Sequence, residues 1–81
     1  MSTDITKVLN ILASYKQMDK KSGLNDLFNI CNQETIDSEA LRVILLNKEK
    51  LIDYLENIMW FHEDVNVKAQ QDFCIEKIKT L

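Results

Sequence analysis

The sequence predicts an all-α fold, a single compact bundle of four to five short helices. One observation is composition: the chain contains no proline and one glycine, the two residues that destabilise helix interiors most. Another is spacing, because apolar side chains recur every three or four positions along most of the chain. The chain has 81 residues, 46% of them hydrophobic and 28% charged. These values are typical of one globular domain, covering residues 1–81.

The first predicted helix covers residues 2–23 and has one apolar face. We expect Gly23 to end it, because glycine readily adopts the positive φ found at helix C-termini. A short second helix is predicted at 24–33, with Asn25 as its N-cap. The polar residues that follow favour a connection, since their side chains compete for backbone hydrogen bonds.

The third predicted helix covers residues 37–47, with Asp37 as its N-cap. Arg42 is the one residue of this helix that we clearly expect to face solvent, because its neighbours are almost all leucine, isoleucine and valine. A helix that is apolar nearly all round is typically buried, so we expect it to form the centre of the core. We favour a break at Asn47, which separates this helix from the fourth.

The fourth predicted helix runs without interruption over residues 48–62. At about 100° per residue, its large apolar side chains occupy one wide arc and its acids the opposite one. The only tryptophan, Trp60, projects into the acidic arc between Glu49 and Asp53. The acidic residues of this arc are Glu49, Asp53, Glu56 and Glu63.

The last predicted helix covers residues 64–81, with Asp64 or Asn66 as its N-cap. Its apolar stripe consists of Val67, Cys74, Ile75, Ile78 and Leu81. Phe73 projects away from that stripe, which repeats the anomaly of Trp60 in a milder form. We therefore add Phe73 to the candidate surface residues.

An aromatic side chain surrounded by acids is typical of an interface that binds another protein. The acidic arc would steer a basic partner toward Trp60. The sequence thus predicts a protein–protein interaction module, such as an inhibitor, an adaptor, an immunity-type or antitoxin-type protein, or a small assembly subunit. A homodimer through the same face is an alternative, and so is burial of Trp60 within the monomer.

Other chemistry finds little support in the sequence. The net charge of −3 argues against nucleic-acid binding, which requires a positive face. A zinc site would need Cys31, His62 and Cys74, none of which forms a closely spaced pair. We expect two buried free thiols, no cofactor and no catalysis. The apolar runs are too short for a membrane span, and no secretory signal is present, so we expect a cytoplasmic protein.

Two further interpretations come from the third helix. The Asp37–Ser38 pair before a helix resembles the acyl and peptidyl carrier proteins, and the resemblance implies Ser38 as the attachment point for phosphopantetheine. In that family a leucine or isoleucine usually follows, where this chain has Glu39. The second and third helices also fit a helix-turn-helix DNA-binding regulator, although the helix that would enter the groove offers Arg42 and few other polar side chains.

Overall fold

A computed structural model describes residues 5–14, 16–59 and 64–81. Within these ranges the chain forms five α-helices and no strand, which confirms the predicted all-α bundle. The helices are α1 (Ile5–Leu12), α2 (Gln17–Cys31), α3 (Ser38–Leu46), α4 (Lys48–Glu56) and α5 (Val65–Thr80). The radius of gyration is 11.6 Å, close to the value of about 12 Å expected for a compact chain of this length.

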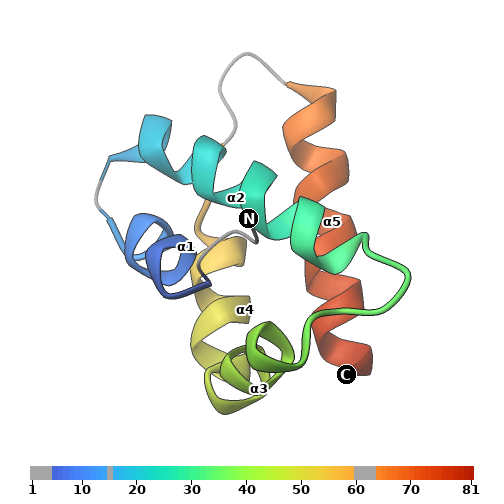
Figure 1. The fold of residues 1–81 in the computed structure, drawn as a ribbon. Helices are drawn as coiled ribbons and strands as arrows, with labels where there is room; N and C mark the ends of the chain where they lie inside the picture. The colour runs from blue at the N-terminus through green and yellow to red at the C-terminus, as the bar shows by residue number, and fades with distance from the viewer. Residues whose placement is uncertain (1–4, 15, 60–63) are drawn as a thin grey trace.

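The helices pack around one apolar core (Figure 1). α1 packs against α2, α2 crosses α5, and α5 packs along α4, which also contacts α1. α3 lies at one end of the bundle, against α1 and α4. The largest fully buried side chains are Val8, Leu12, Leu24, Leu27, Cys31, Ile44, Leu51, Leu55, Cys74 and Ile78. Every helix therefore contributes to the same interior.

Gly23 lies inside α2, so the prediction that it ends a helix over 2–23 is wrong. A Cβ atom on Gly23 would lie 2.8 Å from Cγ2 of Ile11 and 3.4 Å from Cδ2 of Leu12. The glycine is thus required for the close approach of α1, and not for a turn. Asn25, predicted as an N-cap, also lies in the interior of α2.

α3 begins as predicted, because the side chain of Asp37 accepts a hydrogen bond from the amide of Ala40. The expectation that α3 is the centre of the core is wrong. Ile44 is completely buried, whereas Leu46 is 75% exposed. α3 packs against α1 and α4 at the end of the bundle, so one side of the helix is covered and the other is not.

The predicted break at Asn47 is confirmed, since α3 ends at Leu46 and α4 begins at Lys48. The side-chain amide of Asn47 donates a hydrogen bond of 2.9 Å to the main-chain carbonyl of Val43. The same carbonyl also accepts a hydrogen bond of 3.1 Å from the main-chain amide of Asn47, so Asn47 supplies both of its donors. Asparagine terminates α3 here because its side chain can compete with the backbone for such bonds.

α4 ends at Glu56, so the prediction of an uninterrupted helix over 48–62 is wrong. The same device operates as at the end of α3: Asn57 donates from its side chain to the carbonyl of Asp53 at 2.7 Å. The carbonyl of Leu55 accepts a hydrogen bond of 2.6 Å from the buried side chain of Gln71 in α5. These two carbonyls also accept main-chain hydrogen bonds, Asp53 from Asn57 and Leu55 from Ile58, so the side chains add a second donor to each at the end of α4.

Asp64 is the N-cap of α5, which confirms one of the two predicted alternatives. One of its carboxylate oxygens accepts hydrogen bonds from the amides of Asn66 and Val67. The other lies 3.2 Å from the amine of Lys21 in α2. A single carboxylate therefore starts α5 and ties it to a neighbouring helix.

Candidate functional site

Three acidic side chains line the solvent side of α4, as predicted for that part of the helix. Glu49, Asp53 and Glu56 are all exposed, while Leu51 and Leu55 on the opposite side are completely buried. Spacings of four and three residues place the carboxylates one above another along the helix. We call these three residues the acidic face of α4.

No ion pair among the described residues involves the acidic face of α4. The ion pairs there join Lys21 to Asp64 and Lys68 to Asp72. Lys48 donates instead to the main-chain carbonyl of Lys79, at the end of α5. α4 carries two bases, Lys48 and the exposed Lys50, so its three acids exceed its bases by one.

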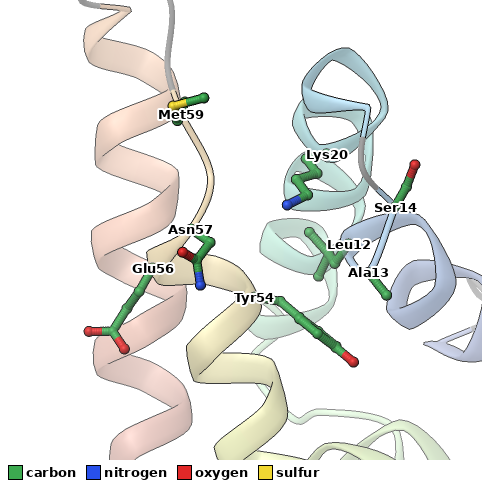
Figure 2. A pocket seen from close by; sticks show the side chains of 8 residues that line it. All are labelled: Leu12, Ala13, Ser14, Lys20, Tyr54, Glu56, Asn57 and Met59. Atoms are coloured by element: carbon green, nitrogen blue, oxygen red, sulfur yellow. The ribbon is translucent and has the colours of Figure 1, made fainter.

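A hollow of about 490 Å³ opens at the C-terminal end of α4 (Figure 2). Lys20 and Leu12 lie on one side of it and Asn57 and Met59 on the other, while Tyr54 extends from α4 toward α1. Its lining residues are Leu12, Ala13, Ser14, Lys20, Tyr54, Glu56, Asn57 and Met59.

The hollow has a mixed lining. Met59 is 58% exposed and offers apolar surface, whereas Leu12, another lining residue, is completely buried. Lys20, Ser14 and Asn57 are polar lining residues. Glu56 lines the hollow and also belongs to the acidic face of α4, so the two are continuous, which the sequence did not indicate.

Two of the predicted partner-binding residues, Trp60 and Glu63, lie outside the described residues. The projection that put Trp60 between Glu49 and Asp53 assumed a helix continuing through residue 62. Because α4 ends at Glu56, that projection does not apply to Trp60. The roles of these two residues stay predictions from the sequence.

Phe73 lies apart from the acidic face. Its ring meets that of Phe28 edge to face, with centroids 5.0 Å apart, so it occupies the side of α5 that packs against α2. α4 packs on the other flank of α5, where Gln71 bonds to Leu55. Phe73 does project away from the buried stripe as predicted, and it remains 38% exposed.

Ser38 is the exposed first residue of α3, beside the N-cap Asp37. Arg42 is exposed on the same helix. These positions leave the carrier-like and the DNA-binding interpretations as predictions from the sequence.

Metal and membrane sites were sought across the same described ranges. No group of three or more histidine, cysteine, aspartate or glutamate side chains there is placed to hold a metal ion. His62, the third ligand of the zinc site considered above, lies outside those ranges. No described helix has both the length and the apolarity needed to cross a lipid bilayer.

Comparison with known proteins adds no functional information. No protein-family model, curated protein or solved structure matches this chain. The function must therefore be argued from the residues themselves.

Proposed function

We propose that this protein is a protein-binding module whose acidic face on α4 docks a basic segment of another protein. The observation that carries the proposal is the continuity of three exposed carboxylates, Glu49, Asp53 and Glu56, with an open hollow that offers the exposed apolar side chain of Met59. A surface of this kind offers both charge and an anchoring position to a partner.

The two parts of the surface have different energetic roles. Exposed ion pairs contribute only about 0–1 kcal/mol each, so the acidic face alone would bind weakly. Its main effect is on the rate of encounter and on the choice of a basic partner. Burial of one large apolar side chain in the hollow contributes about 1.5–3 kcal/mol and slows dissociation.

The geometry supports a partner of one particular chemistry. The proposed partner segment carries basic side chains one helical turn apart, opposite Glu49, Asp53 and Glu56, followed by a large apolar side chain that enters the hollow. An inhibitor, an adaptor or a subunit of a small assembly fits this description. Trp60 and Glu63 would extend the same surface if they lie beside it.

The charge arm of the test compares two triple variants that change the net charge equally. Glu49→Gln/Asp53→Asn/Glu56→Gln neutralises the acidic face, and Glu34→Gln/Glu39→Gln/Glu76→Gln neutralises three exposed acids elsewhere. Proteins captured from the source cells by the wild-type chain are then measured for association with each variant. We expect the first variant to associate on the order of tenfold more slowly at low salt and the second to behave like the wild type.

The hollow has its own matched pair of variants. Ala13→Leu fills the hollow, whereas Ala69→Leu enlarges an exposed alanine on α5. We expect Ala13→Leu to accelerate dissociation and Ala69→Leu to leave it unchanged. The proposal would be refuted if the wild type, the Glu49→Gln/Asp53→Asn/Glu56→Gln variant and the Ala13→Leu variant bound equally well, with circular dichroism confirming that both variants fold.

A further inference from the structure

The contacts between α2 and α5 follow the same residue order along both helices. In order along α2, they are Lys21 with Asp64 at 3.2 Å, Asn25 with Gln70 at 3.1 Å, and Phe28 with Phe73 at 5.0 Å between ring centroids. Cys31 and Cys74 come next along the two helices, and each thiol shifts the pKa of the other. The register of the three contacts leads directly to this pair. The two cysteines thus meet because two packed helices bring them together.

Both thiols are free, and both face this helix interface. Cys31 is 1% exposed and Cys74 is completely buried, and both belong to the apolar core. Buried cysteines commonly serve as small apolar side chains, which was our expectation from the sequence. That expectation gave no reason for the only two cysteines of the chain to be neighbours.

We infer that Cys31 and Cys74 form a reversible intramolecular disulfide by exchange with a low-molecular-weight disulfide, and that this bond ties the end of α2 to the middle of α5. The inference does not depend on the proposed protein-binding function. It assigns to the thiol pair a redox-sensitive stabilisation of the bundle.

The surroundings of the thiols indicate which one reacts first. The neighbouring thiol of Cys74 lowers the pKa of Cys31 against the effect of burial, and the positive charge of Lys77 acts in the same direction. The neighbouring thiol of Cys31 and burial raise the pKa of Cys74. Cys31 ends α2 whereas Cys74 lies inside α5, so Cys31 reaches solvent first. Because the thiolate is the reactive form, the lowered pKa favours the same order, with Cys31 the attacking thiol and Cys74 the resolving one.

The exchange balances without a further reactant. The Cys31 thiolate attacks one sulfur of the small disulfide, that S–S bond breaks, and one thiolate leaves. The sulfur of Cys74 then loses its proton and attacks Cys31, which breaks the mixed disulfide and releases the second small thiol. The protein loses two protons and two electrons, and the small disulfide gains them and becomes two thiols.

Access to the buried pair is available through the end of α2. Cys31 is the last residue of this helix, and the exposed residues 32–35 follow it. Helix ends open locally far more often than the whole domain unfolds. Opening of this last turn brings Cys31 to solvent, so we expect slow exchange that does not require global unfolding.

The experiment treats the folded wild-type protein with oxidised glutathione and follows its intact mass over time, after blocking the remaining thiols with iodoacetamide. We expect a monomer lighter by two hydrogens, with no free thiol left to block. Trypsin digestion should yield a cross-linked pair of peptides, residues 22–42 and 69–77, which contain Cys31 and Cys74. Dithiothreitol should reverse the change.

Stability and single-cysteine variants complete the test. The oxidised protein should unfold at a higher guanidinium chloride concentration than the reduced protein, since the bond closes a long loop. Cys74→Ala should accumulate a glutathione adduct at Cys31 faster than Cys31→Ala does at Cys74, because Cys31 ends α2 and Cys74 lies inside α5. The wild-type mass measurement needs neither variant to fold. Only glutathione adducts, only disulfide-linked dimers, unchanged thiols or a lower unfolding midpoint on oxidation would overturn the inference.

Discussion

The buried side chain of Gln71, in the middle of α5, donates a hydrogen bond of 2.6 Å to the main-chain carbonyl of Leu55 in the last turn of α4. Gln71 is the one buried polar side chain among the described residues. The same carbonyl accepts a hydrogen bond of 3.3 Å from the amide of Ile58, and the bond from Gln71 joins this last turn of α4 to α5. The hollow beside the acidic face of α4 depends on where α4 ends, because Asn57 and Met59 line it.

Replacement of Gln71 should therefore be costly. Gln71→Met keeps the length of the side chain and removes the donor, which leaves a buried carbonyl without that partner. We expect a loss of about 1–3 kcal/mol in the free energy of unfolding, measured with guanidinium chloride. Gln70→Met is the control, because Gln70 is partly exposed and bonds to Asn25 at the surface. It should cost less than about 0.5 kcal/mol. If the two variants lost the same free energy of unfolding, the bond from Gln71 to Leu55 would stabilise the protein no more than the surface bond of Gln70.

Gly23 should not tolerate a side chain. Alanine raises helix propensity by about 1 kcal/mol, but its Cβ would lie 2.8 Å from Ile11, so α1 must move. Ile11 is β-branched and has little rotamer freedom with which to avoid the clash. We expect Gly23→Ala to lower the free energy of unfolding by about 1–3 kcal/mol. Ser22→Ala, at the exposed neighbouring position, should be neutral or slightly stabilising. A stabilised Gly23→Ala protein would contradict the close approach of α1.

Two aliphatic side chains of α3 should respond very differently to truncation. Ile44 is completely buried and Leu46 is 75% exposed. We expect Ile44→Ala to cost about 2–5 kcal/mol, from lost burial and the cavity left behind. Leu46→Ala should cost within about 0.5 kcal/mol. Thermal unfolding of the two variants measures the difference. Similar losses would restore the prediction that α3 is buried all round.

Asp64 should make stability depend on pH in the acid range. The hydrogen bond from Lys21 and the amides of Val67 and Asn66 lower the pKa of this carboxyl below its ordinary value of 3.8. A pKa lowered in the folded state contributes stability above the unfolded pKa, which is lost as the pH falls through the folded value. Wild-type stability should therefore drop below about pH 4.

The matching variant is Asp64→Asn, which keeps a capping side chain and removes the charge. Its unfolding midpoint should change less than that of the wild type between neutral pH and pH values below about 4. Asp72→Asn removes a charge from the same helix away from its first turn, and should retain the wild-type slope. If Asp64→Asn keeps that slope as well, the carboxylate of Asp64 is not its source.

Local signals in the sequence predicted much of the fold. Asp37 and Asp64 precede apolar helical segments, and each caps the helix that follows. Asn47 marks the predicted break because its side chain competes for the carbonyl of Val43. Asn57 carries the same signal, and it ends α4 in the same way, through Asp53. The prediction of a helix over residues 48–62 did not take the side chain of Asn57 into account.

Features that depend on neighbours in space could not be predicted. A glycine at position 23 is compatible both with the end of a helix and with the close packing of another helix, and the sequence alone does not distinguish the two. The apolar run of α3 does not reveal that its packing leaves Leu46 exposed. The hollow arises where the ends of α1 and α4 meet, and the sequence places Ala13 and Met59 far apart. Phe73 was correctly separated from its stripe, but its contact with Phe28 needs the α2–α5 packing.

Zero-length cross-linking tests the proposed docking surface most directly. A carbodiimide joins carboxylates to lysine amines that touch them, so treatment of the complex with its captured partner records which acids lie at the interface. The account predicts bonds from Glu49, Asp53 or Glu56 to partner lysines, identified by mass spectrometry of the digested complex. Bonds confined to Glu34, Glu39 or Glu76, with none from α4, would contradict it.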